Sequence, residues 1–141
     1  MNYTYFMKNI SVMKNNLFLY PVLSLLFILC SFQNSRAQSI SNSVANTVFV
    51  MCDEYGVPMK SDGIAFFLVL HSNKTVNLLM GEDISSAIET GSLNNGKWYA
   101  SGSTITWTWN DSGKSARATY NDTTGNMVAN NGSIFKNLGK F

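Results

Sequence analysis

The sequence has few of the residues on which most catalytic and metal sites depend. Its 141 residues include one histidine, His71, two cysteines, Cys30 and Cys52, and only 13% charged residues. A nucleophile triad needs a histidine near a serine and an acid, and the sequence has no Gly-x-Ser-x-Gly elbow. A zinc site needs several nitrogen and sulfur ligands. These shortages argue against a histidine-dependent hydrolase and a zinc protein, and we assign His71 no role.

The eight acidic residues do not form a catalytic pair in the expected fold. All of them fall in expected turns, loops or a helix cap, and none lies on the aromatic face of a strand, where burial raises the pKa of a general acid. The turns at 111–113 and 121–126 carry oxygen ligands, but neither follows the order of a calcium-binding loop. We therefore expect no catalytic residue, no metal, no cofactor and a non-enzymatic protein.

The first 37 residues follow the order of a secretory signal peptide. Lys8 and Lys14 precede the apolar stretch 17–32, with no acidic residue among them. The polar run 33–37 then ends at Ala37, a small residue of the kind that signal peptidase selects. We predict cleavage after Ala37 and a secreted or periplasmic protein, with residues 38–141 as one small β domain.

Two other fates of this segment stay open. The apolar stretch has 16 residues, interrupted by Pro21, whereas a membrane-spanning helix needs about 20. The stretch is therefore short for a span, and retention as a membrane anchor stays the alternative to cleavage. Once the signal is cleaved, no membrane span is expected. Lipid attachment at Cys30 is the other alternative, although the bulky Leu29 stands where that processing favours a small residue.

Removal of the signal changes the charge and the cysteine count. Three of the ten basic residues lie within it, which leaves seven basic against eight acidic residues and a net charge near −1. The remaining basic residues form no run, so we expect no nucleic acid partner. Cys52 then has no partner within the chain, and a buried free thiol is expected, with pairing between chains as the alternative.

Alternation of apolar and polar residues predicts an all-β antiparallel domain. The main strands are expected at 64–71, 75–80, 97–101, 104–110 and 115–121, with further ones at 44–51, 126–130 and 133–138. One short helix is expected near 83–90, with Asp83 as its N-cap and Gly91 as its stop. Such a meander closes into a small or partly open barrel, with a β-sandwich as the alternative.

Turn chemistry sets the expected strand registers. With His71 opposite Lys74, Val69 pairs with Val76 in the first hairpin. The dipeptide Asn131-Gly132 predicts a hairpin between the last two strands.

The second half gives a register with large residues opposite small ones. Gly102-Ser103 suits a type II′ turn that pairs Trp98 with Trp107. The loop 111–114 then pairs Trp107 with Ala118. This complementarity on one face is what a packed interior needs.

Two segments resemble the short lipocalin-like domains of secreted bacterial proteins. Phe67–Val76 (FLVLHSNKTV) reads as strand, turn and strand, and Gly96–Trp107 continues with a Gly-x-Trp hairpin. The likeness covers about half of residues 38–141, and a Gly-x-Trp opening near the predicted mature N-terminus is lacking. The resemblance implies a β barrel that binds a ligand or a protein partner, and it implies no site residues.

The aromatic residues of the expected inner face are candidate ligand contacts. The candidates are Phe67, Trp98, Trp107, Trp109 and Tyr120. Core packing explains the tryptophans and Tyr120 without any ligand. A cavity above about 300 Å³ among Trp107, Phe67 and Tyr120 favours a small apolar ligand, whereas a filled core with a flat exposed patch favours a protein partner.

Tyr99 and Arg117 are the candidates for binding at the surface. Both fall on the opposite, threonine-bearing face of the expected sheet. An interaction or inhibitor module that uses this face is the alternative to a barrel that carries a ligand. An enzyme of unrecognised type ranks third.

Overall fold

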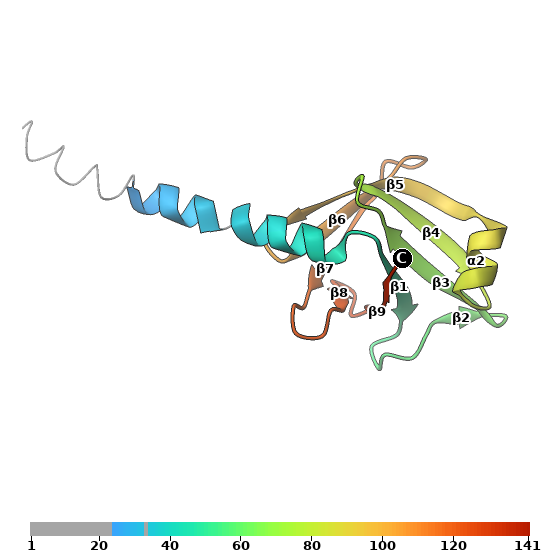
Figure 1. Cartoon of the computed structure of the whole chain (residues 1–141). Helices are drawn as coiled ribbons and strands as arrows, with labels where there is room; N and C mark the ends of the chain where they lie inside the picture. The colour runs from blue at the N-terminus through green and yellow to red at the C-terminus, as the bar shows by residue number, and fades with distance from the viewer. Residues whose placement is uncertain (1–23, 33) are drawn as a thin grey trace, which may run out of the picture. The chain divides into compact units, whose positions relative to one another are not determined.

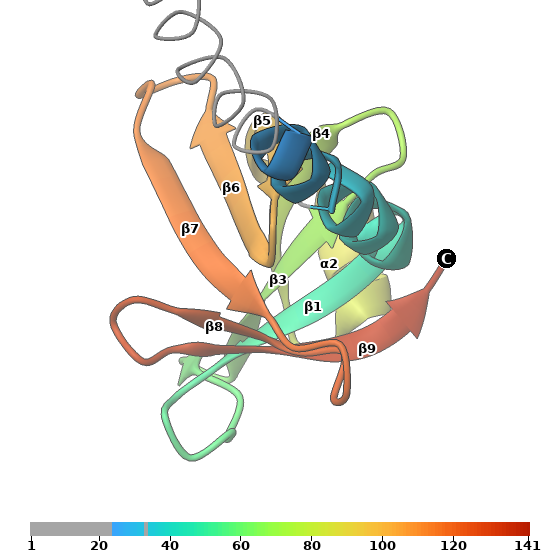
Figure 2. The same ribbon diagram turned by 90° about the vertical axis from the view of Figure 1, so that its left-hand side faces the viewer.

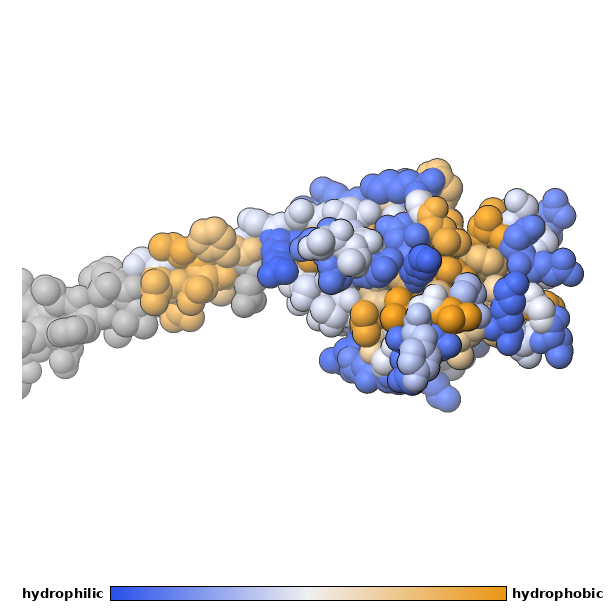
Figure 3. Space-filling view, turned by 90° about the horizontal axis from the view of Figure 1, so that it is seen from below, coloured by the Kyte–Doolittle hydropathy of each residue, from blue (hydrophilic) through white to orange (hydrophobic). Residues whose placement is uncertain are grey.

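The fold is described from a computed structural model, for residues 24–32 and 34–141. The chain divides into two compact units, Met1–Ser35 and Arg36–Phe141. In the first unit, residues 24–32 are helical and expose a run of leucine, isoleucine and phenylalanine side chains, which Figure 3 shows as an apolar surface. Lys8, Lys14 and Pro21 of the predicted signal peptide lie outside the described residues. Within the described ranges, no helix is both long and apolar enough to cross a membrane.

The second unit is built mainly from antiparallel strands (Figure 1). The strands are β1 (Thr47–Cys52), β2 (Lys60–Ser61), β3 (Ile64–Leu70), β4 (Thr75–Gly81), β5 (Ser92–Ser101), β6 (Thr104–Trp109), β7 (Ser115–Tyr120), β8 (Met127–Ala129) and β9 (Ile134–Lys140). The helix α2 (Ile84–Thr90) joins β4 to β5. The expected short helix is confirmed, including Asp83 as its N-cap and Gly91 as its C-cap.

Eight strands form a closed barrel, because β1 pairs with both β9 and β3 while the others pair with their neighbours in sequence. Figure 2 shows the strands around a common interior. The short β2 only extends the edge of β3 beyond β1. The expected barrel is confirmed and the sandwich is excluded, and each of the eight expected strand segments overlaps one barrel strand. Closure gives each of the eight barrel strands a partner on both sides, whereas the two-residue β2 pairs with β3 alone.

The barrel wall separates two apolar clusters. The interior cluster contains inward-facing side chains from all eight strands, and the outer cluster lies on β1, β3 and β4. Helical residues 36–44 cover one end of the barrel, where Ile40 and Val44 are fully buried in the interior cluster. We call this the covered end and the opposite one the open end. A strand expected to begin at Val44 begins instead at Thr47, after Asn46 with a φ of 56° ends the helical segment.

The predicted cleavage after Ala37 falls within helical residues 34–44. The buried residues of this segment are Ile40, Ser41 and Val44, and all three follow Ala37. Cleavage at that position therefore keeps every side chain that closes the covered end. The cleavage itself stays a prediction.

The predicted register of the first hairpin is wrong by one residue. Val69 pairs with Asn77, and Val76 pairs instead with Leu70. The reason is the loop 72–74, which has three residues because Lys74 adopts a left-handed φ of 68° and Thr75 pairs with His71. β3 carries apolar side chains on both faces and therefore belongs to both clusters, and the shift by one residue decides which of its faces points inward.

The second half follows the expected faces with one change of register. Trp98 pairs with Trp107, and Gly102 has the positive φ of 57° that a type II′ turn requires at that position. Trp107, however, pairs with Ala116 and not with Ala118, because the next loop consists of 110–113 and begins one residue early. A shift by two residues keeps each side chain on its expected face.

Candidate ligand site at the open end of the barrel

A pocket of about 520 Å³ opens at the end of the barrel opposite helical residues 36–44. This volume lies within the range of about 300 to 1,000 Å³ that is typical of small-molecule sites. We call it the mouth pocket. Its apolar lining consists of Met51, Leu68, Leu78, Trp107, Trp109, Ala116, Ala129 and Phe135.

Strand alternation and residue size together create the mouth pocket. Trp107 and Trp109 point inward from β6, and their rings meet edge to face with centroids 6.5 Å apart. The inward positions next to them on β7 and β8 carry only Ala116 and Ala129. Small side chains facing large ones leave space on one side of the tryptophans, where a ligand can contact the rings.

The rim of the mouth pocket is polar. It carries Ser115, Arg117, Asn130, Asn131 and Ser133. Arg117 is the one titratable residue among the lining residues, and its side chain is exposed. In the nearby 110–113 loop, a hydrogen bond from the Asn94 side chain lowers the pKa of Asp111, so that this carboxyl is charged at neutral pH. The walls hold no charge, so the pocket favours an apolar ligand with polar groups at one end.

Four of the five candidate aromatic residues lie in the interior cluster, and they divide between its two ends. Trp107 and Trp109 line the mouth pocket, whereas Trp98 and Tyr120 are buried in the same cluster but do not line it. Burial, with the charge of Asp122 as a smaller cause, raises the pKa of Tyr120, which therefore stays a neutral phenol.

Trp98 has a structural task at the covered end. Its Nε1 donates a hydrogen bond to the His71 carbonyl oxygen at 3.0 Å, and the Lys74 Nζ lies 4.1 Å from its ring centroid. The Lys74 ammonium also donates to Ser41 Oγ in the covering helical segment. Trp98 and Lys74 therefore connect the first hairpin to helical residues 36–44.

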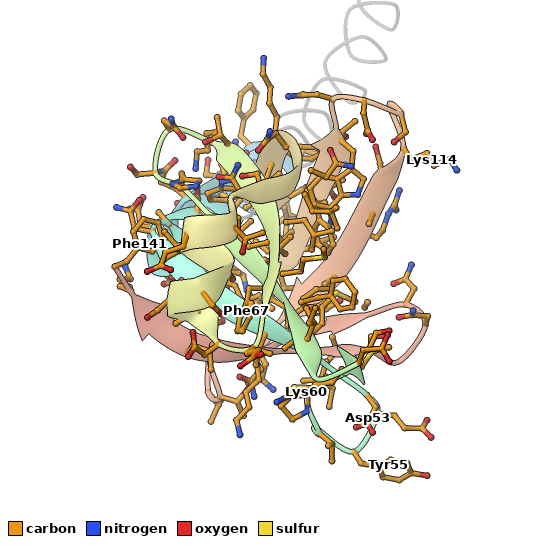
Figure 4. All side chains as sticks on the ribbon, turned by 90° about the vertical axis from the view of Figure 1, so that its right-hand side faces the viewer. Asp53, Tyr55, Lys60, Phe67, Lys114 and Phe141 are labelled. Carbon is orange, nitrogen blue, oxygen red and sulfur yellow. The ribbon has the colours of Figure 1, made fainter. Side chains whose placement is uncertain are left out.

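Phe67 lies on the other side of the barrel wall. It is paired with Val50 on β1 and belongs to the outer cluster, next to α2 (Figure 4). The cavity expected among Trp107, Phe67 and Tyr120 is therefore not formed by those three residues. The cause is the one-residue error in the first hairpin, which exchanged the inner and outer faces of β3. The same error concealed Leu68 and Leu78, which pair with each other and do line the pocket.

The two surface candidates lie in one row on the outside of the barrel. Tyr99 pairs with Thr106, and Thr106 pairs with Arg117 across β5, β6 and β7. Tyr99 is 57% exposed, while Thr106 is buried between its two neighbours. The register brings the two candidates to the same face, as the sequence predicted.

The described part of the chain contains no candidate metal site, and Cys52 is not placed for thiol chemistry. No group of three or more His, Cys, Asp or Glu residues stands in position to hold a metal ion there. Cys52 is a fully buried free thiol in the outer cluster. Burial raises the pKa of this thiol, so the group is a poor nucleophile.

Comparison with known proteins gives no relative from which a role can be transferred. No family model, no curated protein and no solved structure matches the chain. The barrel is compatible with a lipocalin-like fold and with a binding role, which are conclusions from its own geometry.

Proposed function

We propose that the protein is a non-enzymatic binding protein that takes a small apolar molecule into the mouth pocket. The observation that carries this proposal is the open space of about 520 Å³ with an apolar lining beside Trp107 and Trp109. A side chain larger than alanine in this space would bury more apolar surface, which stabilises a fold by about 0.8 kcal/mol per buried CH₂. Two alanines beside two tryptophans instead keep the space open.

The test uses N-phenyl-1-naphthylamine, a neutral apolar fluorophore, titrated into the full chain. We expect saturable binding that quenches tryptophan emission, because Trp107 and Trp109 line the pocket. Ala129→Phe fills the pocket from β8 without removing any existing contact, and we expect at least a tenfold loss of affinity.

Val128→Phe is the matched control on the same strand. Val128 is 44% exposed and does not line the mouth pocket, so this variant should bind the probe as the parent does. Circular dichroism shows that both variants are folded. If the parent does not bind the probe, or if Ala129→Phe binds it with unchanged affinity, the proposal is wrong.

A second candidate function is protein binding through the outer face that carries Tyr99 and Arg117. The row that these residues form with Thr106 favours it, because an exposed tyrosine beside an arginine is typical of interface centres. Tyr99→Ala and Arg117→Ala should then weaken capture of a partner. Tyr99→Ala should also leave probe binding in the pocket intact, because Tyr99, unlike Arg117, does not line it. Unchanged capture by both variants argues against this function.

We also propose export with removal of residues 1–37. The exposed apolar surface of helical residues 24–32 supports the apolar segment of a signal peptide. N-terminal sequencing of the protein recovered from the producing cells should begin at Gln38. A chain that retains residues 24–32 supports an anchor instead, and a lipid on Cys30 supports the lipoprotein alternative.

A further inference from the structure

A second pocket, of about 560 Å³, lies on the outside of the barrel. It extends across the outer faces of β1, β3 and β4, between α2 and the last residues of the chain. We call it the outer groove. No residue lines both the outer groove and the mouth pocket, because the barrel wall separates them. Figure 4 looks onto this side, with Phe67 and Phe141 on either side of α2.

The floor of the outer groove is apolar because β1, β3 and β4 all direct aliphatic side chains outward. Val48, Val69 and Leu79 form this floor, and all three are buried. Val48 and Val69 are directly paired across β1 and β3, so the floor is continuous from strand to strand.

Helix α2 forms one wall and does not close the groove. It is seated on β4 at Gly81, where a Cβ atom would lie 2.5 Å from the Ala87 backbone nitrogen. Ala87 is fully buried at this contact, whereas Ile88 in the same turn is 63% exposed and lines the groove. The close contact at Gly81 therefore fixes the helix so that Ile84 and Ile88 both line the groove, and Ile88 remains exposed.

The opposite wall comes from the end of the chain. Leu138 and Phe141 line the groove and are 49% and 63% exposed. The Phe141 backbone N–H donates to the Asn46 carbonyl oxygen at 3.0 Å, and its ring meets His71 edge to face at 5.4 Å. Large apolar side chains therefore border an apolar floor from both sides.

One end of the groove is polar and ordered by hydrogen bonds. The His71 Nε2 is hydrogen-bonded to Asn77 Oδ1, and the Asn77 side-chain amide donates to Ser92 Oγ at 3.0 Å. His71, Asn77 and Ser92 all line the groove. A ligand therefore meets polar partners at this end and apolar side chains along the remainder.

The charged side chain of the lining is positive. Lys140 and His71 are the titratable side chains among the lining residues, and no Asp or Glu side chain is among them. The Lys140 Nζ donates to the Asn42 carbonyl oxygen at 3.1 Å, in the helical segment that covers one end of the barrel. A cation at the end of an apolar groove favours an amphipathic ligand with a negative head.

We propose that the outer groove binds a free single-chain carboxylate amphiphile, with its chain between α2 and β9 and its carboxylate near Lys140 and His71. The site is independent of the mouth pocket in its residues and in the charge of its ligand.

The test measures binding of dodecanoate to the full chain by titration calorimetry, below the micelle concentration. We expect dodecanoate to bind at least tenfold more tightly than dodecyltrimethylammonium, with dodecanol between them. Ile88→Gln places an amide on the apolar wall and should weaken dodecanoate at least tenfold. Leu93→Gln is the matched control, since Leu93 is also exposed but does not line the groove.

Two further variants separate this inference from the proposed function. Lys140→Met should weaken dodecanoate and leave dodecanol unchanged. Ala129→Phe should leave dodecanoate binding unchanged, since Ala129 lines only the mouth pocket. Loss of dodecanoate binding in Ala129→Phe overturns the groove and leaves the mouth pocket standing. Equal binding of the cationic amphiphile, or an unchanged affinity in Ile88→Gln, also overturns the inference.

Discussion

The ring of Phe135 on β9 meets the ring of Trp107 on β6 edge to face, with centroids 5.5 Å apart. These strands are not neighbours in the sheet, so the contact crosses the barrel interior. It lies in the lining of the mouth pocket and also belongs to the interior cluster. Trp107 therefore contributes both to stability and to the proposed ligand contact.

Trp107→Ala should lower the free energy of unfolding by about 3 to 5 kcal/mol, as large-to-small changes at buried aromatic residues do. Trp107 is 3% exposed and loses its contacts with Phe135 and Trp109. Urea denaturation followed by circular dichroism measures the difference. Tyr99→Ala is the control on the outer face and should change stability by less than about 0.5 kcal/mol. Similar losses in both variants contradict the assignment of Trp107 to the core.

Gly96→Ala should destabilise the barrel by about 1 to 3 kcal/mol, the usual cost of overpacking. A Cβ atom at Gly96 would collide with the backbone carbonyl of Thr108 on the neighbouring strand, which has no rotamer with which to move away. In an unobstructed strand, alanine is instead slightly more favourable than glycine. Thermal unfolding gives the sign of the change. Lys97→Ala, at an exposed neighbouring position, controls for the strand itself, and a stabilised Gly96→Ala variant contradicts this packing.

Asp83 should make the stability of α2 depend on pH in the acidic range. Hydrogen bonds from the Ser86 backbone N–H and hydroxyl lower the pKa of this carboxyl in the folded state. A lowered pKa contributes stability that is present at neutral pH and is lost as the pH falls below about 4 towards the folded-state pKa. Between pH 5 and pH 3, the range around the ordinary pKa of an aspartate of about 4, the melting temperature of the parent should decrease more steeply than that of Asp83→Asn.

Asp83→Ala provides the comparison for the cap as a whole. Alanine has no acceptor for the Ser86 N–H, so this variant should melt lower at every pH, including pH 7. Identical pH profiles for the parent and Asp83→Asn show that the charge of Asp83 makes no contribution.

Cys52 should resist alkylation in the folded protein. It is fully buried, and desolvation raises the pKa of its thiol, so that little thiolate is present at pH 8. Cys30 is exposed and serves as the control within the full chain. Mass spectrometry after iodoacetamide treatment should find Cys30 modified at least tenfold faster, with equal rates in denaturant. Rapid native labelling of Cys52 contradicts its burial.

Local sequence signals were reliable wherever turn chemistry and alternation acted together. Gly102-Ser103 defined its turn, and the pairing of Trp98 with Trp107 followed directly from it. Asp83 and Gly91 defined the ends of α2, because capping depends only on neighbouring backbone groups. The faces of β5, β6 and β7 were also correct, since a shift by two residues preserves them.

The sequence did not determine the length of the loop in the first hairpin, and so it did not determine the register of that hairpin. The same polar residues close a hairpin with Lys74 either in the pair or in the loop, and only a left-handed Lys74 selects the three-residue loop. That single residue decided the inner and outer faces of β3, and with them the exclusion of Phe67 from the mouth pocket. Alternation cannot detect the error when both faces of a strand are apolar.

The sequence by itself determined an all-β antiparallel domain, one short capped helix and the inward position of the tryptophans, because these depend on residues close in the chain. Only the tertiary structure decided the closure of eight strands, since the pairing of β1 with both β9 and β3 joins distant segments. It also decided both pockets. The mouth pocket needs alanines from two strands beside Trp107 and Trp109, and the outer groove needs Ile88 and Phe141, which are far apart in sequence, above one apolar floor.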